Sequence, residues 1–277
     1  MPELTLGFSP CPNDTFIFHA LVHGVITAGG LTFRERLEDV ESLNRLVLDR
    51  ALDISKISFH LLGHIRDDYA LLRSGGALGR GCGPIVVARD RFDPRKLGGK
   101  RVAIPGRHTT ACLLLRLFDP VLDTLVVMPF HEIIEAVARG DVDAGVIIHE
   151  SRFTYQEYGL HAFLDLGEWW EEETGQPIPL GGIVARRSLG TQLLTTVEDA
   201  IRESVLYAQA HPGEATGYIR AHSQEMSDEI CAAHIKLYVN RYSVELDSDG
   251  EAAVITLLER AEAAGIIPRC LHSPFIN

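Results

Sequence analysis

Two short turns carry side chains that could bind or react with a small ligand. They are SPCPND at residues 9–14 and PGRHTT at residues 105–110, and the second offers hydroxyls, an imidazole and a guanidinium. Each follows a short apolar run and precedes a helical pattern. Prolines restrict the backbone of the first turn, and Asn13 or Asp14 is expected to cap the helix after it. A rigid turn without function would explain either segment alone, so a ligand site requires a fold that brings the two turns together.

The rest of the chain alternates between strand and helix patterns. Strands are predicted at residues 4–8, 31–36, 52–58, 83–89, 101–106 (with a turn), 125–128 and 144–148. Helices are predicted at 16–23, 40–47 (capped by Asp39), 110–118 and 131–139, followed by four more at 191–210, 213–221, 227–239 and 249–264. Such alternation predicts an α/β protein with mainly parallel sheets flanked by helices.

The strand–helix order restarts halfway along the chain, which predicts two similar lobes. LDISKISFH (52–60) and VDAGVIIHE (142–150) both follow an amphipathic helix and both carry Asp at the second position. We expect a discontinuous first lobe of residues 1–88 and 184–277 and an inserted second lobe of residues 89–183, joined by the crossing strands GPIVVARD and GGIVARRS. Because ligands of open parallel sheets bind beyond the carboxyl ends of the strands, both turns would face one cleft between the lobes.

Composition limits the classes of binding partner and indicates the cellular compartment of the protein. A formal charge of −12 argues against nucleic acid, since phosphate binding needs a basic face. No segment has the ~18 uninterrupted apolar residues of a membrane span, so no membrane partner is expected. The N-terminal MPELTLGFSP lacks a signal sequence, and the five cysteines form no C-x-x-C pair, which together predict a cytoplasmic protein with free thiols. The sequence indicates no oligomeric state.

Other motifs give little support for a cofactor or a metal. SGGALGRGCG lacks the Lys-Ser/Thr ending of a phosphate loop and leads into a strand, which argues against a nucleotide. The pairs His19/His23 and His60/His64 have metal-ligand spacing, but no third ligand is in register. Cys11 at a helix start could be a nucleophile, although no His or Asp partner is evident. We therefore predict no metal and no cofactor.

Several long motifs permit comparison with a known family. SPCPNDTFIFHALVHG, LEDVESLN, RSGGALGRG, PGRHTTA and IIHESRFTY, found between Leu6 and about Asn240, resemble those of the 1,4-dihydroxy-6-naphthoate synthases of the futalosine route to menaquinone. The resemblance implies a type II periplasmic-binding-protein-like fold, in agreement with the two lobes. It also implies a cytoplasmic lyase that converts cyclic dehypoxanthinyl futalosine to 1,4-dihydroxy-6-naphthoate and releases dihydroxyacetone. The segment after Asn240 matches weakly.

The resemblance also assigns roles to residues of the expected cleft. The histidine of IIHES is the family's proposed general base and corresponds to His149. The substrate-binding candidates, from the resemblance and from the two turns, are Ser9, Asn13, Lys56, Ile57, Ser58, Thr109, Thr110 and Ala111. Forming an aromatic ring by C–C cleavage requires a proton removed from carbon and negative charge held on oxygen. An imidazole, with an unperturbed pKa near ~6.5, is largely a free base at neutral pH.

The sequence offers three candidates for the cation that would bind the substrate carboxylate. Lys56 is one of only four lysines and so is not part of a lysine-rich surface, but a plain salt bridge is its alternative role. Arg107 and Arg152 are further candidates for the same task. Glu150 or Ser151 could orient the ring of His149.

The sequence leaves two alternative functions. One is a cytosolic protein that only binds a small carboxylate, because transporter receptors share this fold. The other is the related chorismate dehydratase of the same pathway, although HESRFTY favours the synthase.

Overall fold

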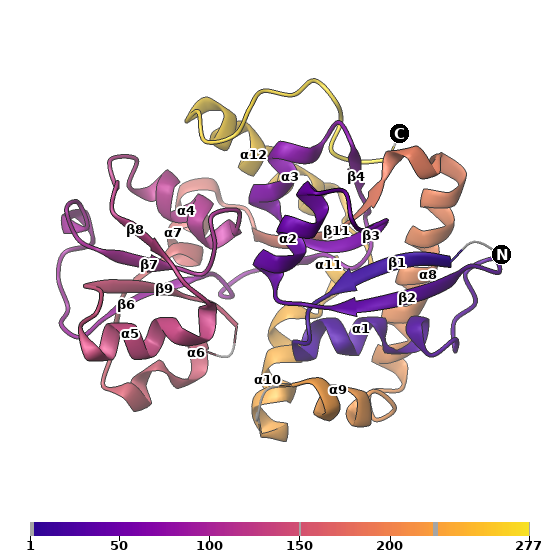
Figure 1. Cartoon of the computed structure of the whole chain (residues 1–277), viewed down its shortest axis with the longest axis horizontal. Coiled ribbons are helices and arrows are strands. Elements are labelled where there is room, and N and C mark those ends of the chain that lie inside the picture. Colours follow the sequence, from indigo (N-terminus) through magenta and orange to yellow (C-terminus); the bar gives the residue numbers. More distant parts are fainter. Residues whose placement is uncertain (1–2, 150, 224–226, 277) are drawn as a thin grey trace.

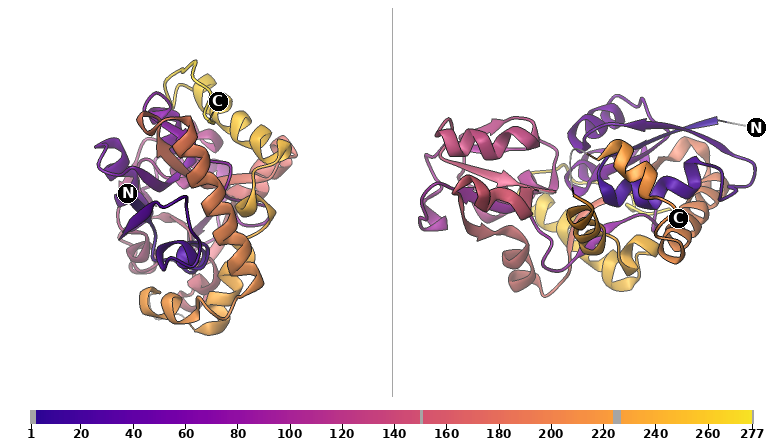
Figure 2. Two further views of the ribbon diagram at one scale, coloured as in Figure 1. Left: turned by 90° about the vertical axis from the view of Figure 1, so that its right-hand side faces the viewer. Right: turned by 90° about the horizontal axis from the view of Figure 1, so that it is seen from below.

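The computed structural model describes residues 3–149, 151–223 and 227–276. Two open β-sheets, each flanked by helices, lie side by side, and both ends of the chain are on the side of the first sheet (Figure 1). The same separation is visible from below, where the magenta elements lie apart from the indigo, orange and yellow ones (Figure 2). This arrangement confirms the predicted α/β fold class.

The first sheet has six strands in the order β2-β1-β3-β11-β4, with β5 paired to β11. The strands are β1 (Glu3–Phe8), β2 (Thr32–Leu37), β3 (Ile54–Ser58), β4 (Tyr69–Leu71), β5 (Ala77–Gly79) and β11 (Ile178–Arg186). β1 runs parallel to β2 and β3, whereas β11 runs antiparallel to β3, β4 and β5. Because β1 and β3 are parallel, the SPCPND turn and Ser58 lie at the same edge of the sheet.

The second sheet has five strands in the order β10-β6-β9-β7-β8. They are β6 (Ile85–Ala88), β7 (Val102–Ile104), β8 (Leu125–Val127), β9 (Ala144–Ile147) and β10 (His161–Asp165). β7 is parallel to β8 and β9, and β6 is antiparallel to β9 and β10. The PGRHTT turn after β7 and His149 after β9 therefore also share one edge.

Twelve α-helices are formed by the described residues. They are α1 (Pro12–Val22), α2 (Val40–Leu48), α3 (Phe59–Ile65), α4 (Thr110–Phe118), α5 (Ile133–Arg139), α6 (Ser151–Thr154), α7 (Leu166–Thr174), α8 (Thr191–Ala210), α9 (Thr216–His222), α10 (Asp228–Tyr238), α11 (Arg241–Val244) and α12 (Ser248–Ala263). Among these, none is long and apolar enough to cross a membrane.

The buried apolar side chains of the described residues form three clusters. One joins the first sheet to α1 and α8, another runs through α3, α4 and α12 and reaches both sheets, and the third lies between α5 and the second sheet.

The chain passes from the first sheet to the second between β5 and β6, and it returns between α7 and β11. β6 thus pairs in the second sheet, although residues 85–88 were placed in the first lobe. All of β11 pairs in the first sheet, although it begins before the boundary placed at residue 184. The boundary at residue 88 is therefore off by the whole of β6, and the boundary at residue 184 is off by part of β11, relative to the sheet in which each strand pairs. The division into lobes itself stays a prediction.

Two predicted helix caps have different outcomes. Asp39 caps α2 as predicted, because its side chain accepts hydrogen bonds from the backbone N–H groups of Glu41 and Ser42. The predicted cap of α1 is wrong, since the helix begins at Pro12 and its N-cap is Cys11. Proline suits the first helical position because its missing N–H would be unpaired there. Asn13 and Asp14 therefore lie in the first turn of α1, where both are buried.

Candidate active site

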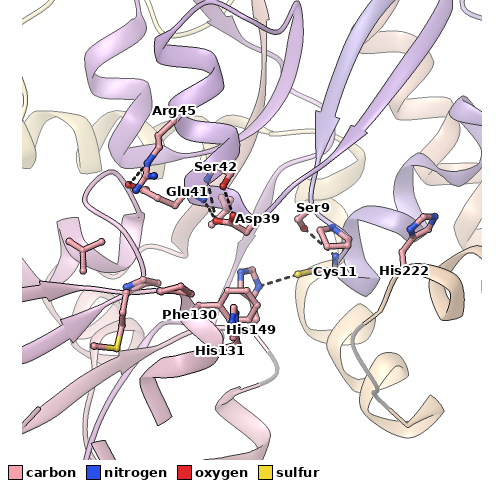
Figure 3. A pocket seen from close by; sticks show the side chains of 16 residues that line it. Ser9, Cys11, Asp39, Glu41, Ser42, Arg45, Phe130, His131, His149 and His222 are labelled. Atoms are coloured by element: carbon pink, nitrogen blue, oxygen red, sulfur yellow. Dashed lines mark hydrogen bonds and ion pairs between the residues drawn. The ribbon is translucent and has the colours of Figure 1, made fainter. Parts of the chain in front are cut away.

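Two adjoining cavities lie where the strands of both sheets end. The outer cavity has a volume of about 570 Å³, and Figure 3 shows side chains that line it. The inner cavity has a volume of about 100 Å³, and Ser9, Val40 and His149 line both cavities. The outer volume lies within the range typical of small-molecule sites. The predicted site residues all line the inner cavity: Ser9, Asn13, Lys56, Ile57, Ser58, Thr109, Thr110, Ala111 and His149. The structure brings them together, and their part in binding or catalysis stays a prediction.

His149 has an unusual backbone conformation. Its φ of 56° lies in the left-handed region, which costs a non-glycine residue about 1–3 kcal/mol. The Nδ1 atom lies 3.7 Å from Sγ of Cys11, and the edge of the ring meets Phe130 at a centroid distance of 5.2 Å. The half-buried imidazole is thus held at the junction of the two cavities by a strained turn and by contacts from both sides of the cleft.

The contact with Cys11 corrects one expectation from the sequence. No histidine partner was evident for this thiol, but the turn after β1 and the end of β9 place Cys11 against His149 across the cleft. Of the two residues expected to orient the His149 ring, Ser151 is buried at the start of α6, and Glu150 lies outside the described residues. The partner is missed by sequence reasoning because the two residues are 138 positions apart.

Lys56 takes part in a buried ion pair. Its Nζ lies 3.2 Å from Oδ1 of Asp14, with 7% and 2% of the two side chains exposed, and it also donates to the Gly75 carbonyl oxygen at 3.2 Å. Asp14 in turn accepts hydrogen bonds from Ser9 Oγ at 2.7 Å and from Asn13 Nδ2 at 2.8 Å. The side chains of the SPCPND turn therefore form a hydrogen-bond network around Asp14, and Asp14 holds the lysine ammonium at the wall of the inner cavity.

The hydroxyl groups predicted to bind substrate already have protein partners. Thr109 caps α4 by accepting from the Cys112 backbone N–H at 3.2 Å. Thr110 Oγ1 donates to the Leu180 carbonyl oxygen at 2.5 Å and accepts from the Phe59 N–H at 2.9 Å, which links α4 to the first sheet.

Ser58 is held in a similar way. Its Oγ accepts from the Asn44 side chain at 3.2 Å, and its backbone N–H donates to the same side chain at 3.0 Å. These bonds fix the wall of the cavity. The backbone N–H groups at the start of α4 have no intrahelical acceptors, because they belong to the first turn of a helix.

Glu41 is a buried carboxylate that sequence reasoning missed. It accepts hydrogen bonds from the backbone N–H groups of Arg107 at 3.1 Å and His108 at 3.4 Å, so α2 is bound to the PGRHTT turn of the other sheet. The approach is close, because a Cβ at Gly106 would lie 2.4 Å from the carboxyl group. Glu41 belongs to LEDVESLN, one of the motifs that carry the family resemblance, and that was the signal available.

The two alternative anchoring cations are placed differently from Lys56. Arg107 is exposed and is not among the residues that line the two cavities. Its backbone N–H donates to Glu41, as described above. Arg152 lines the inner cavity, but its guanidinium donates to the Gly83 carbonyl oxygen and to Asp165 at 2.9 Å. Arg107 is therefore less suited than Lys56 to meet a ligand, whereas Arg152 stays an alternative to Lys56, since both line the inner cavity and both have protein partners.

His234 on α10 is a second histidine of the inner cavity that the sequence did not reveal. Its side chain is fully buried, and its ring stacks on that of His149 at a centroid distance of 6.2 Å and an interplanar angle of 22°. Burial lowers its pKa to about 3, with a smaller contribution from His149 in the same direction. It therefore stays neutral at any pH near 7.

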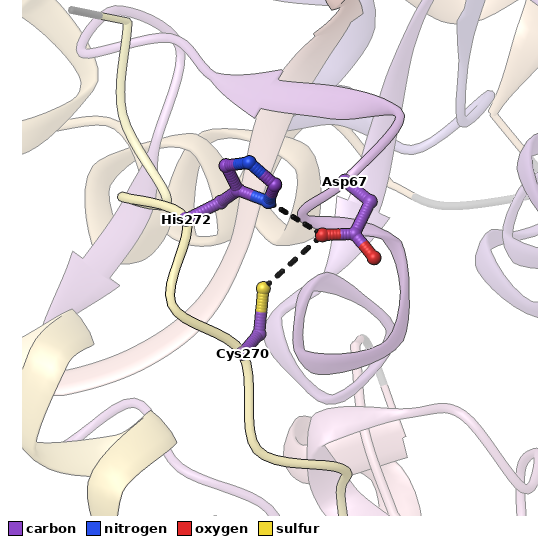
Figure 4. A group of neighbouring side chains, drawn as sticks. All are labelled: Asp67, Cys270 and His272. Carbon is purple, nitrogen blue, oxygen red and sulfur yellow. Dashed lines mark hydrogen bonds and ion pairs between the residues drawn. The ribbon is translucent and has the colours of Figure 1, made fainter.

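Groups that could hold a metal lie outside the cavities. His60 and His64 gain a spatial neighbour in His108 that sequence register did not indicate, with ring centroids 5.6–6.1 Å apart. Among the described residues, these three rings do not bring their ligand nitrogens within 4.8 Å of one another. Within the described part of the chain, one trio of possible ligands is tighter: Asp67, Cys270 and His272 have ligand atoms within 4.8 Å of one another (Figure 4). Hydrogen bonds to Asp67 account for this trio, which ties the C-terminal segment to the turn before β4.

Comparisons with known proteins show the family to which this chain is similar. A family model described as "Menaquinone biosynthesis" matches residues 4–263. The chain is 53% identical over 266 residues to a 1,4-dihydroxy-6-naphthoate synthase of Thermus thermophilus, covering 96% of each protein. It is 48% identical over 270 residues to the synthase of Streptomyces coelicolor, covering 96% of this chain and 95% of the relative.

Solved structures give the same result at the level of the fold. A crystal structure of an Archaeoglobus fulgidus protein is 38% identical, with a TM-score of 0.90 and coverage of 96% of this chain and 98% of that one. The periplasmic aliphatic sulphonate binding protein SsuA of Escherichia coli is 11% identical, with a TM-score of 0.65 and coverage of 97% and 90%. At that identity the likeness concerns the fold alone, and it confirms the periplasmic-binding-protein-like architecture.

Proposed function

This chain belongs to the menaquinone-biosynthesis family of enzymes, and we propose that it is a carbon–carbon lyase that converts cyclic dehypoxanthinyl futalosine to 1,4-dihydroxy-6-naphthoate with release of dihydroxyacetone. The names of the two relatives and the near-complete coverage of all three proteins support this reaction. We also propose that the enzyme works in the cytoplasm, where the rest of a soluble biosynthetic route would operate.

The observation that carries the proposal is the position of His149. The imidazole lies at the junction of the two cavities, on a strained backbone, with Cys11 at Nδ1. In our proposal, Nδ1–H donates to the Cys11 sulfur, so that Nε2 is the unprotonated nitrogen and removes a proton from a substrate carbon. A positioned base of this kind typically contributes ~10²–10⁴-fold to the rate.

The inner cavity suits the carboxylate end of the substrate. A lysine ammonium has three N–H donors, and Lys56 uses one of them for the Gly75 carbonyl oxygen, while Asp14 lies 3.2 Å from Nζ as its ion-pair partner. A further donor of the ammonium, together with the backbone N–H groups of Thr110 and Ala111 at the start of α4, would bind the carboxylate. The larger outer cavity would then hold the remainder of the substrate, with the reacting carbon beside His149.

Turnover by the purified protein tests the proposal. We expect cyclic dehypoxanthinyl futalosine to be consumed and 1,4-dihydroxy-6-naphthoate and dihydroxyacetone to appear in equal amounts, as measured by liquid chromatography with mass detection. His149→Asn is the control for a contaminating activity. Loss of water from chorismate would instead identify a chorismate dehydratase, and tight binding of the futalosine derivative without turnover would identify a binding protein.

A further inference from the structure

His234 has no hydrogen-bond partner in spite of complete burial. Neither Nδ1 nor Nε2 finds a donor or an acceptor among the residues that the structure describes. On α10, Cys231 and His234 are the buried side chains, and of these two His234 lines the inner cavity. Leaving a buried polar group unpaired typically costs about 1–3 kcal/mol, so such a group in a folded protein needs an explanation.

The surroundings of His234 favour a neutral ring that can donate a hydrogen bond. His149 stacks on one side, and Tyr238 lies at a centroid distance of 4.6 Å. Asp14 favours the protonated ring, but burial has the larger effect and lowers the pKa. A neutral imidazole has one N–H donor and one acceptor nitrogen. It can therefore polarise an oxygen atom without giving up its proton, and it does not compete with the neighbouring histidine for one.

We propose that His234 is a second catalytic histidine, which donates an N–H hydrogen bond to the substrate oxygen that becomes negatively charged when His149 removes a proton. In this step a substrate C–H bond breaks, the proton moves to His149, and the electron pair is delocalised onto the oxygen. His234 keeps its own proton throughout. This inference rests on the proposed function, because it assigns a role within that reaction.

A role in catalysis would explain why the protein has a buried histidine whose ring nitrogens are unpaired before substrate binds. A hydrogen bond that forms only when charge develops stabilises the transition state more than the ground state, and a donor prepared in a dry cavity is effective. A purely structural histidine in this position would be expected to bond to a neighbouring backbone or side-chain group, as most buried polar groups do.

Three variants test this role. His234→Leu keeps the bulk and removes both ring nitrogens, whereas His234→Gln keeps an N–H donor. Removing one such donor typically lowers kcat by ~10²–10³-fold, so we expect that loss for the leucine variant, with KM changed less than threefold. The glutamine variant should recover at least about tenfold of the lost kcat. Cys231→Ala, on the same buried face but outside the cavity walls, is the matched control and should keep the parental kcat.

Thermal unfolding separates the catalytic role from a structural one. Because leucine removes an unpaired buried polar group, His234→Leu should melt at the parental temperature or above it while losing activity. A lower melting temperature with kcat within threefold of the parent would overturn the inference. If the parent itself fails to turn over the futalosine derivative, the proposed function is wrong; if the parent is active and the leucine variant is equally active, only the role of His234 is wrong.

Discussion

Cys11 Sγ and His149 Nδ1 lie 3.7 Å apart across the cleft, one on the turn after β1 and the other at the end of β9 (Figure 3). The nitrogen of a histidine that carries the proton is set by the partner of the other nitrogen. A contact at Nδ1 therefore influences which nitrogen of the neutral ring is unprotonated and can act as a base. This contact spans the two sheets, so the reactive form of the imidazole depends on how they are held together.

Replacing Cys11 should have a small but measurable effect on catalysis. A typical hydrogen bond contributes about 0.5–1.5 kcal/mol, so Cys11→Ala should lower kcat by about 2- to 10-fold, with KM nearly unchanged. Steady-state kinetics on the futalosine derivative provide the measurement. A parental kcat would show that the thiol does not orient the ring, and complete loss of activity would indicate that Cys11 is itself a nucleophile.

Replacing His149 should have a much larger effect. His149→Asn keeps hydrogen-bonding ability but cannot take up a proton near neutral pH, so kcat should fall by ~10²–10⁴-fold while substrate binding stays close to parental. In the parent, kcat should decrease as the pH falls and the ring becomes protonated. Near-parental turnover by the variant would transfer the role of base to another group.

The family resemblance made Ser58, Thr110 and His149 candidates, and the local strand and helix pattern predicted where along the elements they lie. Ser9, Ser58, Thr110 and His149 each lie at the end of a predicted strand or at the start of a helix, and the ends of parallel strands meet at one edge. Side-chain partners across the cleft follow no such rule.

The missed residues illustrate this limit. Asp14 was expected to be a helix cap, and its pairing with Lys56 depends on where α1 begins. Glu41 and His234 approach the site from α2 and α10, and their side chains are directed there by packing between elements that are far apart in the sequence. Periodicity identifies the buried face of a helix but does not identify which other element that face will contact.

The ion pair between Lys56 and Asp14 should contribute to stability. Breaking a buried pair by removing one partner typically costs about 3–5 kcal/mol, because the other charge is left buried and uncompensated. Lys56→Met should therefore lower the free energy of unfolding in urea by that amount. Lys56→Met combined with Asp14→Asn should recover part of the loss. Arg139→Met, which breaks exposed ion pairs with Glu135 and Asp141, should cost less than about 1 kcal/mol and is the matched control. A single variant as stable as this control would show that the pair contributes little to the fold.

Stability should decrease in mild acid because of buried histidines such as His60. Its pKa is lowered to about 3, chiefly by burial and then by the nearby charges of His64 and His108, with a smaller effect of Arg116. The folded-state pKa is thus below the unfolded value of ~6.5, so between these values the unfolded chain binds more protons and stability falls with falling pH. Between pH 7 and pH 5 one such histidine should remove about 2 kcal/mol from the free energy of unfolding.

Urea unfolding at the two pH values measures this effect. His60→Gln cannot titrate in this range, so its stability should fall by about 2 kcal/mol less than that of the parent when the pH changes from 7 to 5. The glutamine amide can still donate a hydrogen bond to the Thr109 carbonyl oxygen, which lies 3.3 Å from the His60 ring nitrogen in the parent. His161→Gln, at an exposed position on β10, should leave the pH dependence unchanged, because this side chain is in contact with water in both the folded and the unfolded chain. If His60→Gln and the parent lose the same stability on acidification, the buried imidazole is not responsible for the acid sensitivity.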